Sequence, residues 1–202
     1  LASEIANKIG AKATLVRTGA LYHDIGKMKN PAFFTENQQG GINPHDNLTE
    51  KESARIIIAH VTDGVKIAEE HNLPVIIRDF ILTHHGHGLS KYFYIKYQNE
   101  HPNEVVDKSI FTYPGPNPST REQAILMMAD TCEAASHSLK EYTEESISNM
   151  VNKLVDQQVK DGFFNECRIT FYDIAVAKQV LIERLKAIYH TRIQYPTKLK
   201  RS

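Results

Sequence analysis

The sequence predicts an all-α fold. Apolar residues recur at the three- and four-residue spacing of amphipathic helices through most of the 202 residues. Alternating apolar and polar residues, the signature of half-buried strands, are nearly absent, and only residues 166–171 hint at one. We expect helices over residues 1–9, 15–25, 49–64, 75–85, 124–139, 143–159 and 170–189.

Helix start signals support several of these segments. Thr49 followed by Glu52 is typical of a capping box, in which the two side chains satisfy free amides at a helix start. Ser119 with Glu122 repeats this pattern before the helix over 124–139. Pro74 suits the first turn of the helix over 75–85, because its missing amide hydrogen costs nothing there.

Two stretches, residues 28–48 and 86–118, are predicted to be irregular. Both are rich in proline, glycine, asparagine and aromatic residues, and each follows a histidine cluster. Long irregular segments in a compact domain are usually functional or disordered, and the aromatic residues disfavour disorder. We therefore interpret them as walls of an active-site mouth; packed connectors are the alternative. Without repeats or a linker, residues 1–202 are predicted to form one domain.

Composition excludes several function classes. Lys and Arg number 24 and Asp and Glu number 24, whereas proteins that bind nucleic-acid polymers or anionic membranes usually carry a basic excess. Two cysteines are too few for a disulfide framework and suit a reducing cytosol. No apolar run approaches the ~18 residues that suggest a membrane span. Histidine, at ten copies, is the notable residue.

Six histidine and aspartate side chains fall at positions that should be buried. Burying a lone carboxylate is costly, so an acid in an apolar helix must be paired or bound to a metal. Each of these residues lies in or at the end of a strongly apolar helical segment, and surface roles are therefore improbable. They are His23, Asp24, His60, His84, His85 and Asp130.

These donors predict a metal centre. Imidazole and carboxylate together suit first-row divalent ions such as manganese, iron, cobalt or zinc, and the lack of nearby cysteine disfavours a structural zinc site. Six donors exceed the needs of one tetrahedral ion, which favours two ions bridged by Asp24 and a water. Such a pair activates a hydroxide and neutralises the oxygens of a phosphate ester. Lys27 is placed to hold a phosphate oxygen.

The same residues carry a family resemblance. HDIGK at 23–27, a lone histidine on a helix, HHG at 84–86 and an aspartate in an apolar helix resemble the HD-domain metal phosphohydrolases. Further segments extend the likeness over residues 1–190 to the cytoplasmic HD domain of the seven-transmembrane cyclic di-AMP phosphodiesterases of bacteria. They are NPHD at 43–46, HVTDGVKIA from His60, LP at 73–74 and YPGPNPSTREQAILMMADTCEAASHSL from Tyr113.

The resemblance implies a helical bundle with two divalent transition-metal ions, iron or manganese. It implies hydrolysis of cyclic di-AMP to linear pApA by a metal-bridging hydroxide, with Asp24 and Lys27 as catalytic residues. It also implies a membrane-anchored parent with this domain at the cytoplasmic face. The family has a further histidine ligand before the position of Leu1, so we expect the first helix to begin upstream. By resemblance, one metal has His23, Asp24 and Asp130, and the other has Asp24, His60, His84 and His85.

Several assignments stay open at this point. His45 is either a substrate contact or a loop histidine, and Arg121 either binds phosphate or pairs with an acid. Phe33, Phe34 and Tyr113 either stack on adenine or anchor their loops. Alternative functions are another HD phosphohydrolase activity, on a mononucleotide or a ppGpp-type alarmone, and a regulatory nucleotide-binding module with weak turnover.

Overall fold

The computed structural model describes residues 1–38 and 43–190, and no strand occurs in this part of the chain, which confirms the all-α prediction. Short 3₁₀ helices, η1 to η5, span Ile25–Lys29, Pro31–Phe33, Thr35–Asn37, Pro44–Asn47 and Lys108–Phe111. The α-helices in chain order are α1 (Ala2–Lys8), α2 (Ala13–Tyr22), α3 (Glu50–Glu70), α4 (Val75–Thr83), α5 (Lys91–Glu100), α6 (Arg121–Ser136), α7 (Glu144–Lys160) and α8 (Phe171–His190).

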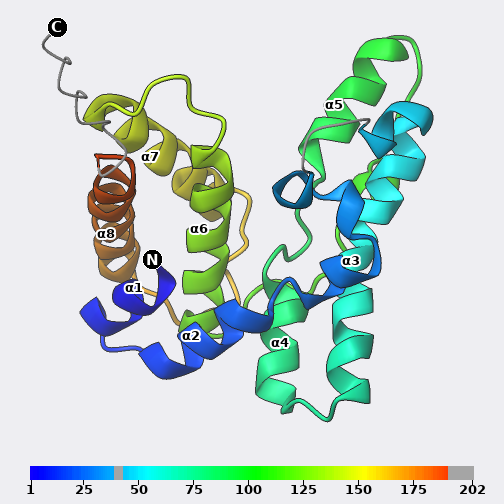
Figure 1. Cartoon of the computed structure of the whole chain (residues 1–202). Helices are drawn as coiled ribbons and strands as arrows, with labels where there is room; N and C mark the ends of the chain where they lie inside the picture. Colours follow the sequence, from blue (N-terminus) through cyan, green and yellow to red (C-terminus); the bar gives the residue numbers. More distant parts are fainter. Residues whose placement is uncertain (39–42, 191–202) are drawn as a thin grey trace, which may run out of the picture.

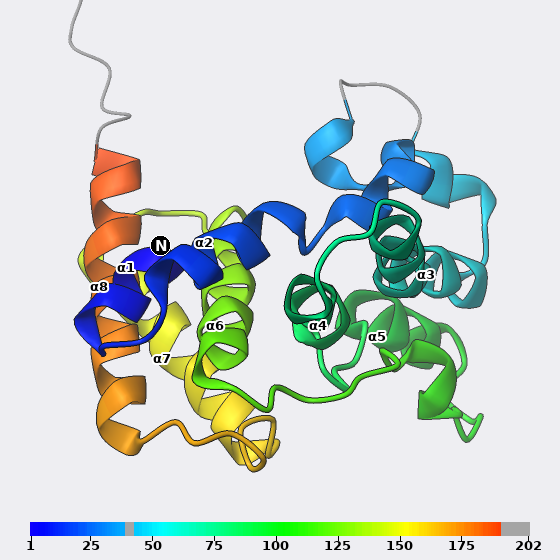
Figure 2. The same ribbon diagram turned by 90° about the horizontal axis from the view of Figure 1, so that it is seen from below.

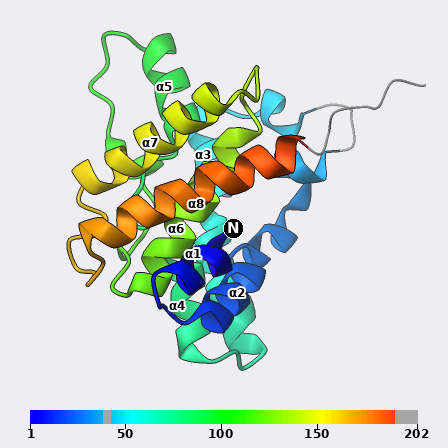
Figure 3. The same ribbon diagram turned by 90° about the vertical axis from the view of Figure 1, so that its left-hand side faces the viewer.

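The helices form two packed groups (Figure 1). Helices α1, α2, α6, α7 and α8 surround the main hydrophobic core, to which α4 adds the fully buried Phe80. In Figure 3, α7 and α8 run side by side, and their apolar faces belong to this core. A second, smaller core lies between α3, α5 and η5, around Ala54, Tyr97 and Phe111. Seen from below, η1 crosses from one group to the other (Figure 2).

Helix α3 begins as predicted and ends later than predicted. Thr49 and Glu52 form both bonds of the capping box, which confirms that start signal. Gly64 does not end the helix, which continues to Glu70. Instead, Gly64 allows α3 to pack closely against Ile81 of α4, because a Cβ on Gly64 would meet Cγ2 of Ile81 at 2.8 Å.

Helix α6 begins and ends three residues earlier than predicted, and its capping pair is shifted by one residue from the predicted pair. The capping box is formed by Thr120 and Gln123 and not by Ser119 and Glu122. The Oε1 atom of Gln123 accepts from the backbone amides of Ser119 at 2.8 Å and Thr120 at 3.3 Å. Two overlapping Ser/Thr-x-x-Glu/Gln patterns stand in this sequence, and only tertiary packing chooses between them.

Two other local predictions are wrong. The stretch over 86–118 contains α5, whose Tyr97 is buried in the second core, so tertiary packing overrides its weak helical pattern. Residues 166–171 form no strand; they are a connection in which the hydroxyl of Thr170 caps α8 by accepting from the amide of Asp173 at 3.1 Å. The stretch over 28–48 holds only short 3₁₀ turns where it is described.

No described helix is both long and apolar enough to cross a membrane. The prediction of a single domain over 1–202 includes residues outside the described ranges and stays a prediction.

Candidate metal centre

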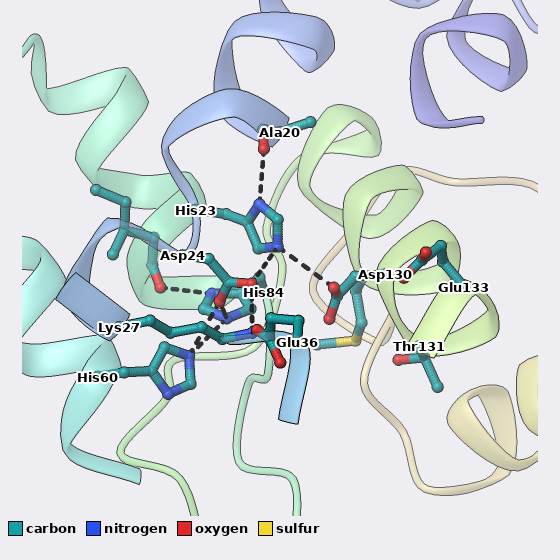
Figure 4. Close-up of polar contacts among 12 residues, drawn as sticks. Ala20, His23, Asp24, Lys27, Glu36, His60, His84, Asp130, Thr131 and Glu133 are labelled. Atoms are coloured by element: carbon teal, nitrogen blue, oxygen red, sulfur yellow. Dashed lines mark hydrogen bonds and ion pairs between the residues drawn. The ribbon is translucent and has the colours of Figure 1, made fainter. Parts of the chain in front are cut away.

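The predicted metal ligands meet where the two helix groups join. His23 follows the last residue of α2, and Asp24 precedes η1. His60 lies in the middle of α3, His84 and His85 follow α4, and Asp130 lies in α6. The structure thus brings residues from sequence positions 23 to 130 into one place, as Figure 4 shows for all of them except His85.

Two glycines make this meeting possible. Gly26 in η1 lies against α3 so closely that a Cβ there would overlap the backbone carbonyl of His60 and would stand 2.5 Å from the amide nitrogen of Gly64. Glycine at both positions allows the backbones of η1 and α3 to come into direct contact. Because Asp24 is two residues from Gly26, this contact places its carboxylate beside His60.

Three of the histidines are oriented by their own helices. His23, His60 and His84 each direct Nδ1 at the carbonyl of the residue three positions earlier, at 2.8, 2.5 and 2.7 Å. A carbonyl only accepts, so Nδ1 carries the ring hydrogen in each and the lone pair of neutral imidazole is left on Nε2. Metal-binding histidines are commonly held in this way.

We call His60, His84 and His85 the imidazole group; their ligand atoms all lie within 4.8 Å of one another. The Nε2 atoms of His60 and His84 are 3.1 Å apart. Burial lowers the pKa of all three histidines, that of His84 to about 4, so they are neutral at pH 7. Two lone pairs that face each other with no proton between them fit a shared cation.

We call His23, Asp24 and Asp130 the carboxylate group; their ligand atoms also lie within 4.8 Å of one another. The Nε2 atom of His23 lies 3.2 Å from Oδ2 of Asp24 and 3.3 Å from Oδ1 of Asp130 (Figure 4). Burial opposes the charge on His23, but the bonds to Asp130 and Asp24 outweigh it and raise its pKa to about 10. Burial also opposes the charge on Asp24, whose pKa His23 and Lys27 nevertheless hold far below its usual range.

Asp24 faces both groups. Its Oδ1 atom lies 3.4 Å from Nε2 of His60 and 3.6 Å from Nε2 of His84, whereas its Oδ2 atom faces His23. One carboxylate with an oxygen toward each set of donors has the geometry of a bridging ligand.

A cavity of about 1010 Å³ opens over the two groups. His84, His85 and Asp130 line it, together with aromatic residues of the predicted mouth loops such as Phe33 and Phe93. Residues of α7 and of the turn after it, such as Leu154 and Phe163, also line it. The volume is at the upper end of the ~300–1,000 Å³ range of small-molecule pockets.

Residues 1–135 match the family model of the HD domain. The chain belongs to the HD-domain family. This HD domain is 45% identical over 196 residues to the cyclic-di-AMP phosphodiesterase PgpH of Listeria monocytogenes and 38% identical over 201 residues to PgpH of Bacillus subtilis. Those matches cover 97% and 100% of this chain but 27% and 28% of the relatives, so the chain spans about a quarter of their length.

A solved structure shares the fold. The crystal structure of the HD domain of L. monocytogenes phosphodiesterase PgpH in complex with cyclic-di-AMP matches with a TM-score of 0.89 at 43% identity, over 93% of this chain and 87% of that one. A structure of the same Listeria domain described without that ligand matches with a TM-score of 0.87 over 94% of this chain.

Lys27 of the HD domain lies at the edge of the carboxylate group. Its Nζ atom is 2.8 Å from Oδ2 of Asp24 and 2.6 Å from Oε1 of Glu36, and it stands over the ring of Phe34 at 5.1 Å. Burial opposes the charge, but Asp24 and Glu36 raise the pKa of the ammonium. A fully charged lysine therefore stands beside the ligands.

His45 lines the cavity among aromatic rings. Its Nε2 atom donates to the carbonyl of Phe33 at 3.0 Å, and its ring packs at about 5 Å from those of Phe33 and Phe93. The residue therefore lies in the mouth of the site and lines the cavity.

Arg121 is not brought to the centre. Its Nη2 atom donates to the carbonyl of Ile9 at 2.5 Å and lies 3.3 Å from Oδ1 of Asp173, so it ties α6 to α1 and α8. This is the acid pairing that the sequence left open beside phosphate binding, and the cavity lining does not include it.

Two neighbours of the site have contacts that the sequence does not predict. Glu36 pairs with Lys27 from the irregular stretch over 28–48, where no periodic pattern marks it. For Tyr113 the sequence suggests only adenine stacking or loop anchoring, and in the structure its ring stacks on His85. Both contacts depend on loop paths that local sequence does not specify.

Proposed function

We propose that this HD domain is a metal-dependent phosphodiesterase that hydrolyses a cyclic dinucleotide, cyclic di-AMP to linear pApA. The likeness to the PgpH relatives supports the substrate, and the opposed Nε2 atoms of His60 and His84 support a cation-dependent reaction. The second observation carries the chemistry, because two buried neutral imidazoles face each other with lone pairs and the carboxylate of Asp24 stands beside both.

The imidazole group and the carboxylate group would each hold one divalent ion, iron or manganese, and Asp24 would bridge them. Two ions held there would supply a nucleophile from water at neutral pH and neutralise charge on the reacting phosphate. The carbonyl bonds at Nδ1 fix the rings of His23, His60 and His84, so their Nε2 atoms are directed into the site before an ion arrives.

Lys27 would bind a phosphate oxygen, because its charged Nζ stands beside the proposed ligand Asp24 and beside Glu36, which lines the cavity. His45 would contact the substrate among the rings of the mouth. The remaining length of the relatives is consistent with a larger parent protein, which we propose to be membrane-anchored with this domain on the cytoplasmic side.

The test is hydrolysis of cyclic di-AMP by the purified chain with Mn²⁺ or Fe²⁺, followed by chromatography of the products. Cyclic di-GMP, AMP and ppGpp serve as comparison substrates. We expect pApA to form only with metal, and cyclic di-AMP to have a much higher kcat/KM than a mononucleotide, because contacts to the distant adenine help to position the reacting phosphate. Equal kcat/KM for cyclic di-AMP and AMP would contradict the proposal.

A further inference from the structure

His85 is the exception among the four histidines of the centre. His23, His60 and His84 each have Nδ1 fixed by a carbonyl three residues earlier. Among the residues that the structure describes, neither ring nitrogen of His85 has a hydrogen-bond partner. Something other than a backbone carbonyl must therefore set the direction of this ring.

The ring of Tyr113 takes that place. It stacks on His85 with centroids 4.2 Å apart and planes inclined by 27°, and the ring of His85 also packs on that of His84 at 4.0 Å. Tyr113 also meets the ring of His60 edge-on at 6.0 Å. It is 9% exposed, so the contact is shielded from water on most sides.

The backbone holds Tyr113 against the turn that carries His85. The amide of Tyr113 donates to the carbonyl of Gly88 at 2.8 Å, three residues after His85. The amide of His87 donates to Oδ1 of Asn117 at 3.0 Å, which fastens the same turn to the same loop a second time. The backbone of Tyr113 is therefore held beside the turn that carries His85, which keeps the two rings within stacking reach.

We propose that Tyr113 is a positioning residue that orients His85 for metal binding through its flat ring and not through its hydroxyl. The inference rests on the metal-binding part of the proposed function and is independent of the substrate. Offset-stacked aromatic rings have a preferred geometry, so the stack restricts rotation of the imidazole about its side-chain bonds. Loss of partners that orient a ligand typically weakens metal binding by ~10–100-fold.

The chain offers a matched control for loss of a buried tyrosine. Tyr97 is 6% exposed and stacks on His101 with centroids 4.2 Å apart and planes inclined by 20°, but it packs in the second core away from the ligands. Methionine fills much of the volume of tyrosine without a flat ring. Tyr97→Met therefore removes a buried, stacked tyrosine ring, together with the bond of its hydroxyl to Glu104 at 2.9 Å, without touching His85.

The experiment is calorimetric titration of the full chain with Mn²⁺, with the melting temperature measured in parallel. We expect Tyr113→Met to weaken one of two Mn²⁺ equivalents on the order of 10-fold, and Tyr113→Phe and Tyr97→Met to keep both. Unchanged Mn²⁺ affinity in Tyr113→Met would overturn the inference, as would equal weakening in Tyr97→Met or in Tyr113→Phe.

A measurement on the unmodified chain covers the case in which Tyr113→Met does not fold. Nuclear Overhauser contacts between the ring protons of Tyr113 and His85 are expected, and their absence overturns the inference. The substrate proposal is judged separately: if cyclic di-AMP is not hydrolysed although Tyr113→Met weakens Mn²⁺ binding, the positioning role stands and the assigned substrate does not.

Discussion

The imidazole group and the carboxylate group lie side by side and differ in burial and in charge. The imidazole group consists of buried, neutral donors; His60 and His84 are 3% and 1% exposed, and a low pKa keeps them uncharged. The carboxylate group is half-buried and already paired internally, through His23 with Asp24 and Asp130. Nitrogen donors favour transition metals, whereas oxygen donors also accept harder ions, so the difference predicts two unequal metal sites.

Removal of the shared ligand is expected to have the largest effect. Asp24→Asn takes away the one carboxylate that faces both groups, and the several kcal/mol that two ions contribute correspond to at least ~1000-fold in turnover. Metal analysis after dialysis and hydrolysis of cyclic di-AMP measure it. Asp156→Asn is the control, because Asp156 is exposed, pairs with Lys178 at 2.6 Å and lies in α7, which carries none of the proposed ligands. Retention of both ions by Asp24→Asn would refute the bridging role.

Single-group substitutions should separate the two sites. His84→Ala is expected to weaken the binding of one metal equivalent and Asp130→Ala that of the other. Each loss of affinity should exceed ~100-fold, the upper limit for losing a residue that only orients a ligand, because here the ligand itself is removed. Titration of each variant with Zn²⁺ and with Mn²⁺ gives the two affinities. We expect His84→Ala to affect Zn²⁺ more than Mn²⁺ and Asp130→Ala to show the reverse order. The same loss pattern in both variants would mean that the groups form one site.

The pH dependence of binding should differ between the groups. His23, with a pKa raised to about 10, is protonated at pH 7 and must release its proton before it binds an ion. Affinity at the carboxylate group should therefore rise by ~10-fold per pH unit between pH 6 and 8, because one proton leaves. The imidazole group, in which burial lowers the pKa of every histidine, should show a smaller change. Calorimetric titrations in buffers of different ionisation heat count the protons that are released as each metal equivalent binds. If neither equivalent releases a proton, the charge assigned to His23 is wrong.

The smallest effect is expected at Lys27, whose contact with the proposed ligands is limited to Asp24. Lys27→Ala should lower turnover by ~10-fold or more, the scale of one lost charged contact to phosphate, and leave two metal equivalents bound. Lys29→Ala, an exposed lysine two residues away, serves as the control. Loss of metal in Lys27→Ala would assign the lysine to the structure of the site, and unchanged kinetics would remove it from the mechanism.

The sequence predicts the features of this molecule that depend on neighbouring residues, and it does not predict those that depend on contacts between distant segments. The six proposed ligands can be selected from sequence because a polar residue in an apolar helix is costly to bury unless it has a partner or a metal. Capping at Thr49 is also local and is confirmed. Helix α5 is not predicted because it has no side-chain cap and its one buried residue, Tyr97, packs on Ala54 and Phe111 from distant segments. The role of Glu36 is not predicted because its contact with Lys27 depends on the path of an irregular loop.

The contact between Gly26 and Gly64 also determines where the two hydrophobic cores meet. His23 and Asp130 extend from the helices of the main core, whereas His60 extends from α3 of the second core. An ion bound between them would cross-link the two halves and would have no comparable site in the unfolded chain. By mass action, a metal at 100 times its dissociation constant would add about 2.7 kcal/mol to the folding free energy. The melting temperature of this domain should therefore report the free metal concentration around it.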